Sequence, residues 1–299
     1  MMTKINRHQI SFISLSLVIL YICLTSQSSS LADINISLNG IGNTIIFLSL
    51  CLIGTLGVGH GALDGKIIWE HSDKVGAKIK LYALYILLVS LGAIVWIYSP
   101  FCGLVLLLLL SSIHFGLSDL SFLGNKGLIP KICWGFTMTF LPVLFKPSLV
   151  YLLFLELTSV SISTEIFGVI RMLVVLSILI FVSCLIFRML QKEKKEPVAL
   201  KLAILELFLL IILAYYLSPL VWFGLYFCGL HGLRAMLAFD FKFIPDALWL
   251  IIFTAPISLF IFLVEWSYDL SSLLIVFPVL ASLTIAHMLL PRLKDLVGS

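Results

Sequence analysis

Ten apolar runs, each long enough to cross a lipid bilayer, follow one another along this 299-residue chain. A transmembrane helix needs about 20 mostly apolar residues. The runs cover residues 10–26, 43–63, 79–98, 101–120, 131–154, 166–188, 199–217, 219–239, 245–264 and 270–290. With 61% hydrophobic and only 11% charged residues, the chain is expected to be an all-α, polytopic transmembrane helical bundle. No loop is long enough for a separate soluble domain, so residues 1–299 are expected to form a single integral-membrane domain.

Charge alternates between the loops on the two sides of this bundle. One set of loops, with the two chain ends, holds most basic residues: Lys4, Arg7, Lys66, Lys74, Lys78, Lys80, Lys126, Lys131, Arg188, Lys192, Lys194, Lys195, Lys201, Lys242, Arg292 and Lys294. The charged residues of the opposite loops are all acidic: Asp33, Glu156, Glu165, Glu265 and Asp269. Three basic residues near or within spans do not fit this division, namely Lys146, Arg171 and Arg234. By the positive-inside rule, we expect ten spans with both termini in the cytoplasm, in a bacterial inner membrane.

The first run leaves one alternative open. Residues 1–32 combine a basic start, an apolar core and a Ser-rich exit, which is also the pattern of a signal peptide. Cleavage would leave nine spans and would not move the other helices.

The net charge of +4 does not indicate a nucleic-acid partner. No basic stripe with interleaved aromatic residues is present, and the lysines lie in short loops between spans. The six cysteines lie in apolar segments without C-x-x-C spacing, which is typical of small packing residues.

Four of the six histidines lie inside apolar runs: His60, His114, His231 and His287. An ionisable side chain within the membrane costs several kcal/mol unless it is paired or bound. All four fall in the cytoplasmic half of helices that run in the same direction, so their imidazoles are expected at one depth. Imidazole suits Fe, Zn, Cu and Ni, and the four together predict a metal site in the core of the bundle. Each one alone is more typical of a hydrogen-bonded packing residue or an interfacial one than of a ligand.

Three charged residues accompany these histidines. Asp64 follows His60 by four residues, Asp119 follows His114 by five, and Arg234 follows His231 by three. Ligand histidines usually donate their second N–H to a carboxylate or carbonyl, so Asp64 and Asp119 are candidates to support the ligands, and Arg234 is placed beside them. The alternative is that they are helix-end residues at the water interface. His8 and His71, which lie in charged segments, are expected to be solvated.

An aromatic stretch precedes His231. Trp222, Phe223, Tyr226 and Phe227 could line a tunnel for a long conjugated lipid, although their spacing is more typical of bundle core.

The four histidine segments, taken in order, resemble the Brp/Blh family of membrane β-carotene 15,15'-dioxygenases. The stretches are Gly59-His60-Gly61-Ala62-Leu63-Asp64, His114-Phe115-Gly116 with Asp119 close behind, His231-Gly232-Leu233-Arg234, and Ala286-His287-Met288-Leu289. The resemblance implies a multi-span enzyme that holds a non-haem Fe(II) through histidines and cleaves β-carotene centrally with O₂ to give retinal. It also implies a functional link to a retinal-binding rhodopsin.

One position departs from the family pattern. The pattern H-x-x-R-H ends in a histidine that is normally an iron ligand, and this chain has Ala235 there. The resemblance therefore carries His60, His114 and His231 over as ligands, whereas a ligand role for His287 is our own inference.

Two other functions remain open from the sequence. The chain could be a non-enzymatic carotenoid- or retinal-binding membrane protein that has lost activity, because Ala235 replaces an expected ligand. It could also be a haem or ion-translocating membrane protein, since intramembrane Asp and His residues can relay protons.

Overall fold

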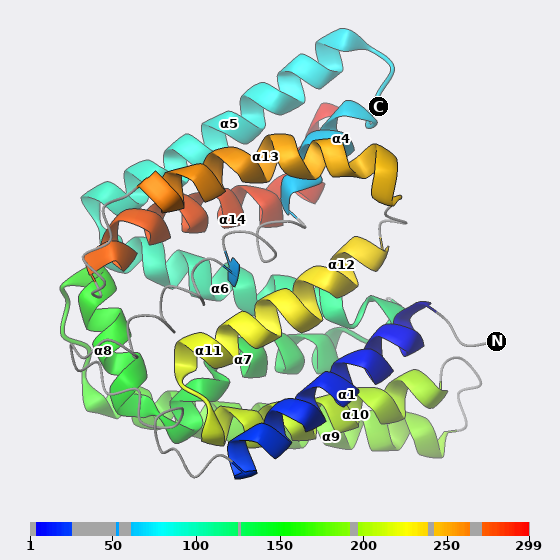
Figure 1. Cartoon of the computed structure of the whole chain (residues 1–299), viewed down its shortest axis with the longest axis vertical. Coiled ribbons are helices and arrows are strands. Elements are labelled where there is room, and N and C mark those ends of the chain that lie inside the picture. Colours follow the sequence, from blue (N-terminus) through cyan, green and yellow to red (C-terminus); the bar gives the residue numbers. More distant parts are fainter. Residues whose placement is uncertain are drawn as a thin grey trace.

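The helices of the chain lie side by side in an all-α bundle (Figure 1). The computed structural model describes residues 4–25, 52–53, 61–124, 127–191, 197–238, 242–263 and 271–298. The main helices are α1 (Lys4–Thr25), α4 (Asp64–Trp69), α5 (Val75–Tyr98), α6 (Pro100–Asp119), α7 (Leu128–Phe145), α8 (Pro147–Thr158), α9 (Thr164–Leu190), α10 (Pro197–Tyr216), α11 (Pro219–Gly224), α12 (Leu233–Ala238), α13 (Phe243–Leu263) and α14 (Ser271–Val297). Most of the helix predicted over 43–63, including His60, lies outside the described residues.

Seven of the described helical stretches are long and apolar enough to cross a membrane. They are α1, α5, α6, α7, α9, α10 and the continuous stretch Pro219–Leu237. This confirms an integral membrane protein with many spans. The helices α13 and α14 also occupy the predicted ranges 245–264 and 270–290, and α14 extends further to Val297.

The prediction of a single helix over 131–154 was wrong. The chain forms two helices there, α7 and the shorter α8, which meet at Lys146. Lys146 has φ −129° and ψ 50°, outside the helical region, and it precedes Pro147. A proline ring disfavours helical geometry in the residue before it, so the helix ends there despite the continuous apolar pattern.

The outer surface of the bundle is apolar, as lipid contact requires. Helix α9 shows this most clearly, because its buried residues form one narrow stripe of Phe167, Val174, Phe181 and Leu185. Many of its other aliphatic side chains are exposed, including Leu179 and Leu190. In water such a surface would be a large exposed apolar patch, whereas in a bilayer it is matched by hydrocarbon.

Helices α6 and α7 touch through their backbones at two glycines. A Cβ added to Gly116 would lie 1.8 Å from the carbonyl oxygen of Lys131, and one added to Gly135 would lie 1.8 Å from that of Ser112. Small residues allow such close approach between membrane helices. The contact fixes the depth of His114 and Asp119, both on α6, against α7.

A π-helical segment, η5 (Leu225–Gly232), joins α11 to α12. The sequence predicted this stretch as part of one ordinary helix over 219–239. In a π-helix, hydrogen bonds run between residues five apart, so such residues lie nearly above one another. In an α-helix, with 3.6 residues per turn, they would point about 140° apart. The segment therefore places Tyr226 and His231 on one face.

Helix α1 docks into the bundle through a polar stripe, and the expectation that His8 is solvated was wrong. His8 is only 8% exposed, and its Nε2 lies 3.1 Å from the carbonyl oxygen of Gly229 in η5. Next to it, Gln9 is fully buried against α10. His71 lies at the surface, as expected, with its Nε2 3.1 Å from the carbonyl oxygen of Gly298.

The glycine contact gives a first prediction. We expect Gly135→Ala to lower the stability of the protein by about 1–3 kcal/mol, because its Cβ has no space against the backbone of α6. Thermal unfolding in detergent measures the effect. The matched control is Gly168→Ala on α9, where an added Cβ would meet nothing within 4 Å. Equal melting temperatures for the two variants would contradict the backbone contact.

Candidate metal centre

Three of the four predicted histidines meet in the core of the bundle. His114 comes from α6, His231 from η5 and His287 from α14. The ring centroid of His114 lies 5.2 Å from that of His231 and 5.2 Å from that of His287. His60 lies outside the described residues, but a Cβ added to the next residue, Gly61, would lie 3.7 Å from the His287 imidazole.

A buried carboxylate orients His231. Nδ1 of His231 lies 2.7 Å from Oδ1 of Asp119, and both side chains are completely buried. An ionised carboxylate only accepts hydrogen bonds, so the proton of the ring is on Nδ1. The other ring nitrogen, Nε2, is then the atom with a lone pair for a metal ion.

A second carboxylate does the same for His287. Nδ1 of His287 lies 2.8 Å and 3.0 Å from the two carboxylate oxygens of Asp64. The hydroxyl of Tyr85 donates to Oδ2 of Asp64 at 2.9 Å. Each carboxylate therefore supports a histidine that lies on another helix. The sequence had suggested that each would support the histidine that precedes it on its own helix.

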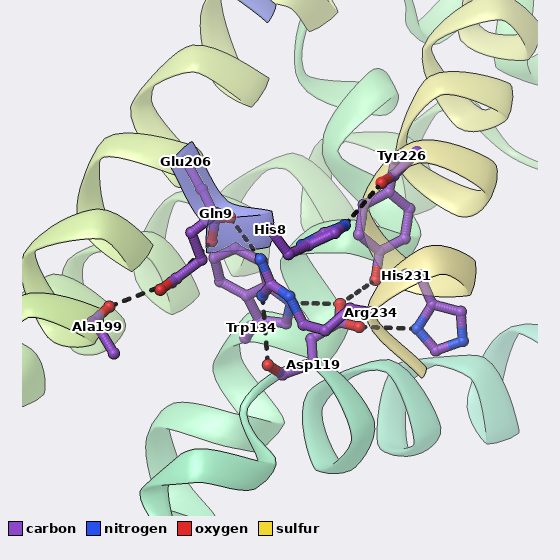
Figure 2. Close-up of polar contacts among 10 residues, drawn as sticks. His8, Gln9, Asp119, Trp134, Ala199, Glu206, Tyr226, His231 and Arg234 are labelled. Carbon is purple, nitrogen blue, oxygen red and sulfur yellow. Dashed lines mark hydrogen bonds and ion pairs between the residues drawn. The ribbon is translucent and has the colours of Figure 1, made fainter. Parts of the chain in front are cut away.

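Asp119 is the centre of a larger buried network (Figure 2). Besides contacting His231, its carboxylate accepts hydrogen bonds from Nε1 of Trp134 at 2.9 Å and from the hydroxyl of Tyr226 at 2.7 Å. These partners come from α7 and η5. Since Tyr226 and His231 are five residues apart, the π-helical register allows both to reach the same carboxylate.

Arg234 links this network to two residues that sequence reasoning missed. Its guanidinium donates to the backbone carbonyl of Asp119 at 3.3 Å and forms an ion pair with Glu206 on α10. Glu206 in turn accepts a hydrogen bond from Gln9 of α1 at 3.3 Å (Figure 2). A glutamate within an apolar span was the signal that could have identified Glu206. Nothing in the sequence pattern indicated Gln9.

The donors present are suitable for a metal ion. Nε2 of His114 is buried and makes no hydrogen bond within the described part of the chain, which is costly unless another group satisfies it. Two neighbouring imidazoles have carboxylate partners, as ligand histidines usually do. Within the described residues, no three His, Cys, Asp or Glu side chains form a group that could hold one ion. Ligation of a single ion by these histidines therefore stays a prediction.

The aromatic stretch before His231 divides into two stacked pairs. Trp222 and Tyr226 stack at 5.6 Å between ring centroids, and their polar atoms bond the carbonyl of Leu210 and the carboxylate of Asp119. Phe223 and Phe227 stack at 5.2 Å. Phe227 also lies parallel to the His231 ring, with 5.8 Å between centroids. The first pair packs in the core and joins the network, and Trp222 also borders the cavity that Phe223 and Phe227 line.

Two mainly apolar cavities share wall residues beside the histidines. The first, of about 170 Å³, lies among α6, α7, α8, α11 and α14, and its walls include Leu104, Leu153, Phe223, Phe227, Ala281 and Thr284. The second, of about 290 Å³, lies among α4, α5, α13 and α14, and its walls include Tyr85, Val89, Phe227, Phe253, Thr284 and His287. Phe227 and Thr284 border both cavities, and Thr284 precedes His287 by three residues on α14.

A third cavity, of about 280 Å³, adjoins the histidines from another direction. Its inner wall contains Asp64, His114, His287 and Ala235. The position that departs from the family pattern thus faces the candidate centre, and its methyl group leaves space there.

This combination defines a class: an integral-membrane helical protein with a buried histidine and carboxylate centre beside apolar cavities. Residues 51–295 match the sequence model of the family described as Beta-carotene 15,15'-dioxygenase. The chain is also 32% identical, over 195 residues, to a protein named Beta-carotene 15,15'-dioxygenase from the uncultured marine bacterium 66A03. That match spans 64% of this chain and 68% of the relative. No solved structure matches the chain. The protein therefore belongs to the β-carotene 15,15'-dioxygenase family.

The Asp119 network gives a second prediction. We expect Asp119→Asn to weaken metal binding by about 10–100-fold, because the amide cannot hold the His231 ring in the same tautomer and orientation. Metal titration of the purified protein measures the change. Glu165→Gln at the surface-exposed start of α9 removes the same charge far from the histidines and serves as control. Unchanged affinity in Asp119→Asn would contradict the role of this carboxylate.

The ion pair behind the site gives a third. We expect Glu206→Leu to destabilise the fold by about 3–5 kcal/mol, because it leaves the buried Arg234 charge without its carboxylate. The double variant Glu206→Leu with Arg234→Met should lose less, since neither charge remains buried. Thermal unfolding in detergent compares the two. A single variant as stable as the double one would argue against this pairing.

Proposed function

We propose that this protein cleaves β-carotene at its central double bond with O₂ and releases two retinal molecules. The observation that carries the proposal is that two apolar cavities share the wall residues Phe227 and Thr284, beside the histidines. A long apolar molecule with two similar halves suits this arrangement, because each half can occupy one cavity while its middle lies at the junction. Membership of the family supports the same substrate.

In this proposal the metal is Fe(II), held by His60, His114, His231 and His287. Non-haem iron sites in proteins favour imidazole ligands. Gly61, the residue that follows His60, lies against the His287 ring. The bound iron would supply the activation of O₂. The described imidazoles would bind through Nε2, with Asp119 and Asp64 holding the ring protons of His231 and His287 on Nδ1.

The protein's own contribution is orientation and a dry cavity. The apolar walls hold the polyene in place and exclude water from the reacting bond. Phe227, stacked on His231, lies in the wall of both cavities, where the substrate would pass the centre. We assign Phe223 and Phe227 to the substrate tunnel, with Trp222 lining the same cavity and Tyr226 supporting it through Asp119.

The proposal extends to the membrane topology. We infer one domain of ten spans in a bacterial inner membrane, with both termini in the cytoplasm. In support, the start of α1 and the ends of α4, α9 and α12 lie on the same side of the bundle, the right side of Figure 1. Most basic residues belong to the chain ends and loops of this set. Retinal formed there would be available to a retinal-binding rhodopsin in the same membrane.

A second candidate is a carotenoid- or retinal-binding protein without turnover. Ala235 favours it, because this residue faces the same cavity as His114 and His287 and supplies no ligand.

One experiment separates the two candidates. We expect carotene-producing cells that express this chain to accumulate retinal, measured by chromatography of pigment extracts. His114→Ala should abolish retinal formation, because it removes the histidine that adjoins both others. His71→Ala, at the surface, should leave it unchanged.

Pigment that copurifies intact, without retinal in iron-supplied cells, would reject cleavage and favour the binding protein. Retinal formation by His114→Ala at the wild-type rate would reject the proposed centre.

A further inference from the structure

We propose that the cavity beside Ala235 is a water-filled path by which a hydrated divalent metal ion reaches the histidines from the aqueous end of the bundle. The path shares no wall residue with the first apolar cavity, and it shares Asp64 and His287 with the second. It rests on the proposed function only in taking the histidines as ligands of the metal.

The lining of this cavity changes from the centre to the surface. Its inner end is formed by His114, His287 and Asp64, and Ser118 lies beside them. Its outer end is formed by Lys294 and Asp295, in the last turns of α14. Asp295 is exposed, so the cavity connects the centre to a charged surface of the protein.

The size of this cavity and the polar side chains in its mainly apolar wall allow water to enter. A volume of about 280 Å³ accommodates several water molecules. Carboxylate, hydroxyl and imidazole groups along its wall provide the polar partners that an ordered water requires. The same groups can replace part of the hydration shell of a passing cation.

The first apolar cavity cannot offer this route. The polar side chains in its wall are limited to the hydroxyls of Ser111, Thr139 and Thr284 among its described residues. Moving a divalent ion through such a cavity would remove water molecules from its hydration shell without replacing them, at a cost of many kcal/mol. A carotenoid has the opposite preference, so the two kinds of molecule need different entrances.

His114 provides the second observation. Its Nε2 atom is buried and makes no hydrogen bond within the described part of the chain, although the residue borders this cavity. A buried nitrogen of this kind is normally satisfied by water or by an ion. A cation that enters between Lys294 and Asp295 would meet this atom at the inner end of the path.

Ala235 determines the width of the path at its inner end. A side chain with several more carbons at this position would fill the space beside His114 and His287. The change can be matched elsewhere, because Ala281 on α14 borders the first apolar cavity and is similarly buried. Ala235→Leu and Ala281→Leu therefore add the same side-chain volume, the first beside the proposed path and the second beside the first apolar cavity.

The test measures metal exchange in the purified full-length protein. Apo protein is mixed with Co²⁺, and uptake is followed by the absorbance of Co²⁺ bound to nitrogen ligands. We expect Ala235→Leu to slow uptake by about tenfold or more, while the metal content after long incubation equals that of wild type. We expect Ala281→Leu to take up Co²⁺ at the wild-type rate and to bind less carotenoid.

A labelling experiment tests the path without metal or catalysis. Ala235→Cys and Ala281→Cys are reacted with a charged, water-soluble thiol reagent in intact bilayers, with the labelling of the native cysteines subtracted. Ala235→Cys should react and Ala281→Cys should not. Labelling is independent of carotenoid cleavage, so it distinguishes failure of the path from failure of the proposed function.

Three results would overturn the proposal: Co²⁺ uptake by Ala235→Leu at the wild-type rate, equal slowing in Ala281→Leu, or an Ala235→Cys thiol that does not react. Reaction of Ala235→Cys together with slow uptake by Ala235→Leu would support it even if the wild-type protein produced no retinal.

Discussion

The structure around the histidines depends on one fully buried carboxylate, that of Asp119. A single ionised side chain in the core of a membrane bundle is costly unless donors surround it. Here the donors come from Trp134 on α7 and from Tyr226 and His231 on η5. Because each of these bonds is directional, α6, α7 and η5 can meet in only a narrow range of arrangements. Packing among apolar helices in lipid is less selective, since lipid is as apolar as the side chains.

Much of the fold could be predicted from the sequence, because in a membrane a helix is required wherever the chain is apolar for long enough. Eight of the ten predicted ranges correspond to helical stretches of similar extent. The range 43–63 lies mostly outside the described residues, and the range 131–154 is divided at Lys146. In that case the proline restricts the residue before it through a local steric contact, which an average over apolar content does not detect.

The candidate site was predicted in its residues but not in its connections. The histidines are conspicuous because they are polar residues in apolar runs, and Asp64 and Asp119 were selected because they closely follow His60 and His114. Their pairing could not be read from spacing, because Asp119 supports His231 and Asp64 supports His287 across helices. Which helices are neighbours is a property of the folded bundle. For the same reason, Gln9 on α1 gave no signal, although it reaches Glu206 behind the site.

The π-helical segment η5 has a consequence for the rest of its helix. An α-helix has better hydrogen-bond geometry than a π-helix, so this segment persists because Asp119 holds Tyr226 and His231 together. If it relaxed to an α-helix, every later residue of the helix would rotate about the helix axis. The rotation would be up to about 100°, the angle between successive residues of an α-helix. Arg234 would turn away from Glu206 and Ala235 away from its cavity. Asp119 thus sets the angular position of α12, whose Arg234 donates a hydrogen bond to the Asp119 backbone carbonyl.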